Sequence, residues 1–174
     1  PDTTMISVRN ACKTFVMHNQ GSAQVHAYDG VSFDVMAGEC RVLTGPSGSG
    51  KTAMLRSLYA NYKPTSGQIF IQHDGSLQRL TDEQPRLVLD MRLRTIGYVS
   101  QFLRVIPRVT TLDLVADPLI KTGADETAAK AKAKDLLARL NLPEEHWSLP
   151  PASFSGGEQQ RVNIARGFIY DYPI

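Results

Sequence analysis

The stretch GPSGSGKT at residues 45–52 decides the fold that we predict for this chain. It has the pattern GxxxxGK[ST] and stands between a short apolar run, CRVLT at 40–44, and a segment with helical periodicity. Glycines let consecutive backbone N–H groups turn inward, and the N-terminus of the following helix adds its positive end. Such a loop suits a polyphosphate, with Lys51 reaching the β- and γ-phosphates and the Thr52 hydroxyl binding Mg²⁺.

The stretch therefore predicts a P-loop that binds a nucleoside triphosphate and Mg²⁺, against the plainer interpretation of a Gly/Ser turn. The predicted nucleotide-binding residues of the loop are Gly45, Pro46, Ser47, Gly48, Ser49, Gly50, Lys51 and Thr52.

Residues outward from the loop predict an α/β fold. Alternating apolar side chains in MISVR (5–9) and VSFDV (31–35) indicate an antiparallel layer. The near-continuous apolar run 40–44 predicts a strand buried on both faces of a parallel sheet, and TIGYVSQ (95–101) predicts another short strand. Asp74 and Gly75 predict the turn of a hairpin.

Helical patterns dominate after residue 102. Thr110 or Thr111 is a plausible N-cap for a first helix. The clearest helix is ADETAAKAKAKDLLARLNLP at 124–143, which opens with acidic residues and ends with basic ones, matching the helix dipole. Its Lys-rich face is interpreted as solvated rather than as a surface for nucleic acid or membrane.

A second glycine turn, Ser155, Gly156, Gly157 and Glu158, leads into another helix with apolar positions from Val162 to Ile169. A glycine turn at a helix N-terminus is again an anion-binding device. A second one about a hundred residues beyond the first more naturally serves a nucleotide held by another copy, which implies a head-to-tail composite site closed by two-fold symmetry.

Composition bounds the class of protein. The chain has 19 Lys plus Arg against 17 Asp plus Glu, so a broad basic field for nucleic acid is not expected. No apolar run approaches the roughly 20 residues of a membrane span. Cys12 and Cys40 lack CxxC spacing and are interpreted as small buried residues of a reducing compartment. We expect a cytoplasmic protein, with any membrane contact made through a partner.

The order of P-loop, YVSQ (98–101) and FSGGEQQR (154–161) resembles the ATP-binding cassette (ABC) ATPases over essentially the whole chain. The resemblance implies ATP and Mg²⁺ as ligands, a P-loop NTPase core with an N-terminal antiparallel β-subdomain, and an α-helical subdomain. It implies that Phe15 stacks on adenine and that Gln101 contacts Mg²⁺ and the attacking water. Ser155, Gly156, Gly157 and Glu158 then contact the γ-phosphate bound by the opposing subunit. Phe154 stands where Leu is commoner in the family, and Glu158 where Gln is.

Three longer segments, at 55–69, 97–108 and 153–174, resemble the ATP-binding subunits of the phosphonate carbon-phosphorus lyase system. That resemblance implies lyase subunits as partners. The first alternative is the ATPase subunit of a lipoprotein-release or macrolide-type transporter, which needs a membrane permease. The second is a nucleotide-gated assembly module.

The resemblance also implies domain boundaries: a core with β-subdomain at 1–101, a helical subdomain at 102–160 and a return toward the core at 161–174. Hydrolysis in the family uses an apolar strand ending in Asp-Glu and a later histidine, which we expect beyond Ile174. We therefore expect a C-terminally truncated fragment that contains no catalytic residue, with weak nucleotide binding and no turnover by itself.

Other candidates receive plainer interpretations. Asp90 ends the run RLVLD but precedes the Gln101 segment, so it is not expected to replace the missing Asp. The apolar stretch QFLRVIPRV (101–109) lines either a partner groove or the subdomain core. The histidines are interpreted as scattered surface or loop residues, and the arginines as mainly solvated, with an anionic partner as the alternative; these are His18, His26, His73, His146, Arg92, Arg94, Arg104 and Arg108.

Overall fold

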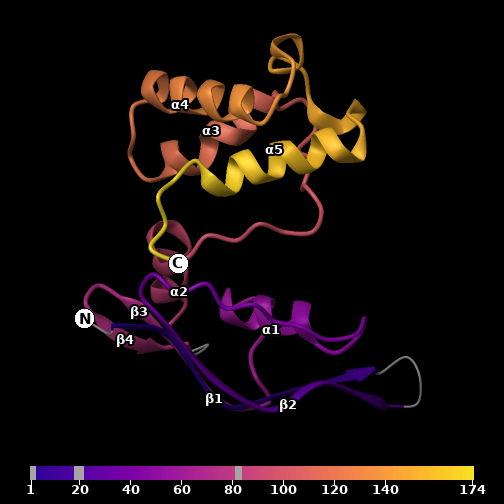
Figure 1. Cartoon of the computed structure of the whole chain (residues 1–174), viewed down its shortest axis with the longest axis vertical. Helices are drawn as coiled ribbons and strands as arrows, with labels where there is room; N and C mark the ends of the chain where they lie inside the picture. Colours follow the sequence, from indigo (N-terminus) through magenta and orange to yellow (C-terminus); the bar gives the residue numbers. More distant parts are fainter. Residues whose placement is uncertain (1–2, 18–21, 81–83) are drawn as a thin grey trace. The chain divides into compact units, whose positions relative to one another are not determined.

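The computed structural model describes residues 3–17, 22–80 and 84–174, and it divides into two compact units, Pro1–Arg92 and Leu93–Ile174. The first unit contains the sheet and two helices, and the second contains three helices (Figure 1). His18 lies outside the described residues.

A four-stranded antiparallel sheet forms the first unit, in the order β2-β1-β3-β4. Its long strands are β1, Thr4–Met17, and β2, Ala23–Met36, while β3, Ser66–His73, pairs with the other edge of β1. Ile6 and Val8 are buried in β1, which confirms the predicted inward face of the first strand. The predicted antiparallel layer is confirmed as well.

The hairpin between β3 and β4, Ser76–Arg79, turns at the predicted dipeptide. Asp74 has a φ of 47° and Gly75 a φ of 85°, so both central residues adopt the left-handed conformation of a tight hairpin turn. The pair His73 and Ser76 closes the turn.

Helix α1, Lys51–Leu58, follows the P-loop and packs on β2, where the hydroxyls of Tyr28 and Ser57 form a buried hydrogen bond of 2.8 Å. Helix α2, Pro85–Arg94, was not anticipated from the sequence. Two features of the sequence could have predicted this helix: the proline at its first position, and the spacing that places Val88 and Met91 on one face.

The second unit is built from α3, Thr111–Lys121, α4, Glu126–Arg139, and α5, Gly156–Phe168. Two short 3₁₀ turns, Glu144–His146 and Pro151–Ser153, precede α5. The predicted cap of α3 is Thr110, whose side-chain oxygen accepts from the Asp113 amide at 3.2 Å. The fully buried residues Leu114, Val115, Ala129, Ala133, Leu137, Val162, Ala165 and Ile169 form the core.

Two predicted strands are absent from the described structure. Residues 40–44 and 95–101 carry no strand assignment, and the Val42 side chain that we expected to be buried is 71% exposed. A strand is stable only when a neighbour accepts its backbone hydrogen bonds, and no described strand pairs with residues 40–44. The start of the second segment does have a backbone partner: the Gly97 amide donates to the Ile174 carbonyl at 2.8 Å, and the Ile174 amide donates to the Thr95 carbonyl at 3.0 Å.

The apolar stretch at 101–109 fits both earlier interpretations in part: some of its side chains belong to the helical core, and others are exposed and available to a partner. Leu103 and Val109 pack against the helical core, whereas Phe102 is 76% exposed and Ile106 44%. The predicted burial of the cysteines is wrong, because Cys40 is exposed and Cys12 half-buried. Both are free thiols. Among the described helices, none is long and apolar enough to cross a bilayer.

Candidate functional site

The P-loop in the first unit has an exposed backbone and leads into the N-terminus of α1. Gly48 and Gly50 have φ values of 79° and 89°, a region that other residues rarely adopt. At Gly50 the turn also brings the chain against β2: an added Cβ would lie 1.9 Å from the Ala27 carbonyl oxygen. Glycine at position 50 is therefore required by the packing of the loop.

Lys51 places its ammonium group inside the loop. Its Nζ donates to the carbonyl oxygens of Gly45 at 2.7 Å and Pro46 at 2.6 Å, and to Ser49 Oγ at 3.2 Å. The backbone and side-chain oxygens of the loop therefore hold a positive charge within the loop. The next side chain, Thr52, is exposed at the second position of α1.

The N-terminus of α1 lacks a capping side chain and has no acidic residue in its first turn. By contrast, side chains cap the three helices of the second unit, namely Thr110 on α3, Asp125 on α4 and Ser155 on α5. The first N–H groups of a helix have no acceptor within the helix. At α1 they are therefore available to an anion, and no carboxylate of that turn competes for them.

Phe15, the predicted adenine platform, lies near the end of β1 with a half-buried ring. Its ring meets Tyr62 edge to face, with centroids 5.2 Å apart. The Lys13 ammonium lies over the Phe15 ring at 4.9 Å from its centroid and donates to the Lys63 carbonyl at 2.7 Å. An adenine that stacks on this face has to displace the ammonium.

Gln101, the other predicted nucleotide contact, lies in the second unit. Its side chain is exposed in a bend. The preceding residue is anchored, because Asn163 of α5 donates to the Ser100 carbonyl at 2.6 Å. The role of Gln101 at Mg²⁺ stays a prediction.

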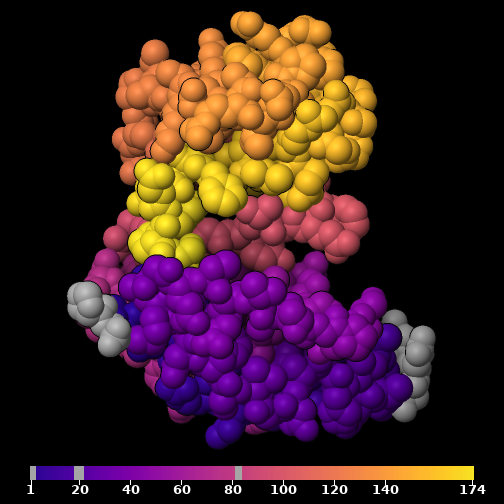
Figure 2. Space-filling view, viewed as in Figure 1, coloured from indigo at the N-terminus to yellow at the C-terminus, as the bar shows by residue number. Residues whose placement is uncertain are grey.

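The second glycine turn is exposed at the tip of α5, and residues 153–174 form part of the visible surface of the second unit (Figure 2). Ser155 and Glu158 form a capping box: the Glu158 amide donates to Ser155 Oγ at 3.3 Å, and Glu158 Oε2 accepts from the Ser155 amide at 3.0 Å. An added Cβ at Gly156 or Gly157 would meet nothing within 4 Å.

Nothing in the described fold therefore requires glycine at positions 156 and 157. Glycine near a helix start costs stability relative to alanine, about 1 kcal/mol in a helix interior. A pair of glycines that no neighbour requires leaves the helix tip open to close approach from outside.

The hydrogen bond from the Ser155 amide, followed by that from its hydroxyl, lowers the pKa of Glu158 below the ordinary glutamate range. His146 adds to this from 3.5 Å, with its ring stacked on Phe154. Glu158 is therefore ionised at neutral pH, and its carboxylate fixes the shape of the tip.

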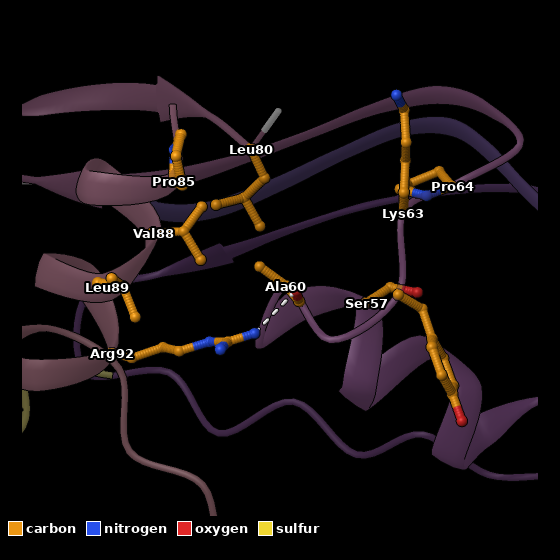
Figure 3. Close-up of a pocket in the computed structure, with 10 residues that line it drawn as sticks. Ser57, Ala60, Lys63, Pro64, Leu80, Pro85, Val88, Leu89 and Arg92 are labelled. Carbon is orange, nitrogen blue, oxygen red and sulfur yellow. Dashed lines mark hydrogen bonds between the residues drawn. The ribbon is translucent and has the colours of Figure 1, made fainter. Parts of the chain in front are cut away.

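A largely apolar cavity of about 350 Å³ lies at the other end of α1, away from the P-loop (Figure 3). Val88 and Leu89 of α2 line one side, and Arg92 donates to the carbonyls of Tyr59 at 2.9 Å and Ala60 at 2.8 Å. Arg92 thus binds the C-terminal end of α1 instead of being solvated. Because none of the predicted nucleotide-binding residues lines this cavity, we do not assign the nucleotide to it.

The pattern of the family described as "ABC transporter" matches residues 28–174, which include the P-loop and the α5 tip. The chain belongs to this family. It is a P-loop NTPase of the ABC ATPase type, as the sequence predicted.

Relatives of this ABC ATPase include an "Uncharacterized ABC transporter ATP-binding protein" of Thermotoga maritima, 36% identical over 167 residues. The alignment covers 96% of this chain and 69% of that protein. The lipoprotein-releasing system ATP-binding protein LolD of Idiomarina loihiensis is 38% identical over 152 residues, covering 87% of this chain. The matched region spans 64% of that LolD.

Solved structures of ABC cassettes have the same fold as this chain, which supports the family assignment. The dimeric ABC transporter cassette MJ0796 superposes with a TM-score of 0.83 at 32% identity, covering 97% of this chain and 71% of that one. A second structure of MJ0796, a dimer in a post-hydrolysis state bound to ADP and Pi, gives a TM-score of 0.82 at 31% identity with the same coverage.

The histidine interpretation needs correction at His73. This side chain is buried, and its Nε2 lies 3.0 Å from Asp90 Oδ2, so it is neither a surface nor a loop residue. Asp90 lies on α2 and contacts this imidazole. The sequence spacing gave no sign of the pair, because strand β3 and helix α2 meet only through the fold.

Proposed function

We propose that this ABC ATPase binds MgATP between two copies arranged head to tail. The P-loop residues of one copy hold the triphosphate, and Ser155, Gly156 and Gly157 of the other copy close over the γ-phosphate. In the protein as the cell makes it, opening and closing of this sandwich accompanies ATP hydrolysis.

The observation that carries the proposal is the α5 tip. Its two glycines are exposed, and a Cβ added at either one would meet no described atom within 4 Å. The N–H groups of Gly156 and Gly157 lie in the first turn, where the helix offers no acceptor. An anion from outside satisfies these donors, and only glycine lets a phosphate come so close to the backbone.

The P-loop supports the other half of the proposal. The uncapped N-terminus of α1 and the Lys51 ammonium within the loop both favour the triphosphate. The exposed hydroxyl of Thr52 is available to bind Mg²⁺. The dimeric structures of MJ0796, one of them bound to ADP and Pi, support a pairing of two copies.

Replacing Gly157 with aspartate tests the composite site. Aspartate at the second position of a helix favours the helix dipole, so the variant is expected to fold with unchanged or slightly higher stability. Its carboxylate faces the γ-phosphate of the other copy, so MgATP-dependent dimerisation should weaken by at least about tenfold. Analytical ultracentrifugation with MgATP or a non-hydrolysable analogue measures the loss.

Thr127→Asp is the matched control, because Thr127 is exposed at the second position of α4. This control should dimerise like the wild type. Equal dimerisation by Gly157→Asp and Thr127→Asp would remove the α5 tip from the nucleotide site.

Two partner systems are candidates for the process that ATP hydrolysis by this protein drives. The LolD relatives favour a transporter, in which the protein drives a membrane permease from the cytoplasmic side. The second candidate, a subunit of the phosphonate carbon-phosphorus lyase system, rests only on the resemblance of the segments at 55–69, 97–108 and 153–174, and the relatives reported above do not support it. The exposed Phe102 and Ile106 suit a partner surface in either system.

Affinity purification from the native cell separates the two candidates. Tagged protein should bring down a membrane permease under the transporter proposal, and cytoplasmic lyase subunits under the other. A Phe102→Ala, Ile106→Ala variant should lose the partner while keeping MgATP affinity, and Leu77→Ala, at an exposed apolar side chain of β4, serves as control. Capture of neither kind of partner, with the protein folded and nucleotide-bound, contradicts both assignments.

A further inference from the structure

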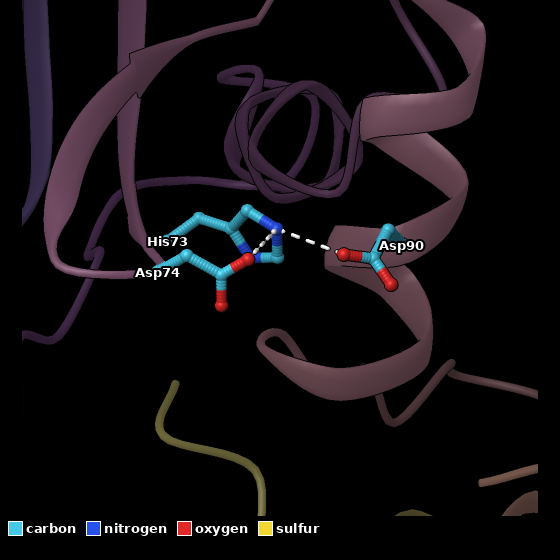
Figure 4. A group of neighbouring side chains, drawn as sticks. All are labelled: His73, Asp74 and Asp90. Carbon is cyan, nitrogen blue, oxygen red and sulfur yellow. Dashed lines mark hydrogen bonds and ion pairs between the residues drawn. The ribbon is translucent and has the colours of Figure 1, made fainter.

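The end of the β3–β4 hairpin brings one histidine and two aspartates together in the first unit (Figure 4). His73 is the last residue of β3, and Asp74 follows it in the turn. Asp90 reaches the same point from α2. Sixteen positions in the chain separate the two carboxylates, since 90 − 74 = 16, so the fold creates the cluster.

The ligand atoms of the cluster converge on one point. His73 Nε2 lies 3.0 Å from Asp90 Oδ2 and 3.4 Å from Asp74 Oδ2. One ligand atom from each of the three residues lies within 4.8 Å of the others. Ligands held at the bond lengths of Zn²⁺ in a tetrahedral site are roughly 3.3 Å apart, so these separations are close to those of a coordination shell.

Burial gives the cluster an inner wall and an open side. The His73 side chain is only 3% exposed, whereas Asp90 is 38% and Asp74 62% exposed. The imidazole therefore forms the floor of the cluster, and the Asp74 carboxylate lies toward solvent. A cation has a route in, and water has room to complete its coordination.

We propose that His73, Asp74 and Asp90 form a binding site for a divalent transition-metal ion, with Zn²⁺ as the ion of choice. A neutral imidazole and two carboxylates carry a charge of −2, which one divalent cation balances. The nitrogen ligand selects against Mg²⁺ and Ca²⁺, which take oxygen ligands. The imidazole and carboxylate set with a water as fourth ligand is a usual environment for zinc.

The bound ion ties the hairpin to α2. Asp74 belongs to the turn and Asp90 to the helix, so a shared ion adds a link between two elements that the His73–Asp90 contact already joins. From α2 the chain continues directly toward Gln101. The site stands apart from the P-loop residues and does not depend on the proposed function.

Zinc titration of metal-depleted protein in the absence of nucleotide tests the site. We expect one Zn²⁺ per chain by isothermal titration calorimetry. The melting temperature of the protein should rise by roughly 5 to 10 °C when Zn²⁺ exceeds its dissociation constant a hundredfold. Mg²⁺ at the same concentration should produce no such rise.

Asp74→Asn removes one ligand with little risk to folding, because asparagine tolerates the φ of 47° at this turn. Its Zn²⁺ affinity should fall at least about tenfold. Asp90→Asn is the second variant: it keeps an amide that can hydrogen-bond to His73, and it should lose zinc to a similar degree. Asp135→Asn, on the exposed face of α4, is the matched control and should bind zinc like the wild type.

The titrations are run in a Cys12→Ser, Cys40→Ser background, because free thiols also bind zinc. Failure of that protein to bind Zn²⁺ overturns the proposal. So does equal zinc affinity in the parent, Asp74→Asn and Asp90→Asn proteins, since the ion would then lie elsewhere. If His73 and Asp90 only hydrogen-bond, Asp90→Asn changes stability in metal-free buffer, and zinc has no effect on any variant.

Discussion

Replacing Lys51 with alanine is expected to lower the affinity for MgATP by at least about a hundredfold. The Lys51 ammonium already lies in the loop, at 2.6 to 2.7 Å from two loop carbonyl oxygens. In the proposed nucleotide complex the ammonium would exchange these for phosphate oxygens, and each charge-assisted hydrogen bond contributes about 1.5–3 kcal/mol. Two such bonds account for the predicted loss.

Isothermal titration calorimetry of the protein with MgATP measures this effect. Lys134→Ala is the control, because Lys134 is exposed on α4 and alanine favours the helix. The control variant should keep wild-type affinity. An affinity of Lys51→Ala within threefold of the wild type would refute the assignment of the loop as the triphosphate site.

Gly50→Ala is expected to have the second large effect, on folding as well as on binding. The new Cβ would lie 1.9 Å from the Ala27 carbonyl oxygen and 2.8 Å from its carbon, both in the backbone of β2. Neither atom can move without disturbing the sheet. Together with the positive φ, this should lower the free energy of unfolding by about 3 kcal/mol or more.

Gly48→Ala provides the matched comparison within the same loop. Gly48 also has a positive φ, but an added Cβ there meets nothing within 4 Å. It should cost only about 1 kcal/mol, the strain of the left-handed conformation. Urea denaturation of both variants measures the difference. Equal losses would mean that the loop does not pack against β2 as described.

Local patterns predicted several elements correctly because their interactions span only a few residues. The predicted cap of α3 is an example, because the Thr110 side chain accepts from the amide of Asp113, three residues ahead. The α4 ion pair of Glu126 and Lys130, 2.6 Å apart, likewise depends on helical spacing alone. The P-loop pattern and the Asp74-Gly75 turn belong to the same class, because glycine at a positive φ is a property of the residue.

Long-range contacts determined the parts of the fold that local sequence patterns did not predict. The runs at 40–44 and 95–101 have the apolar character of buried strands, yet a strand also needs a hydrogen-bonding neighbour, and composition does not supply one. Helix α2 and the buried imidazole of His73 depend on the packing of β3 against a helix from later in the chain. Residue order thus specified the phosphate loop, the α3 cap and the hairpin turn, since each depends on residues that are close together in the sequence. Tertiary structure alone decided strand pairing and the His73 cluster, because burial and pairing join residues that are distant in the sequence.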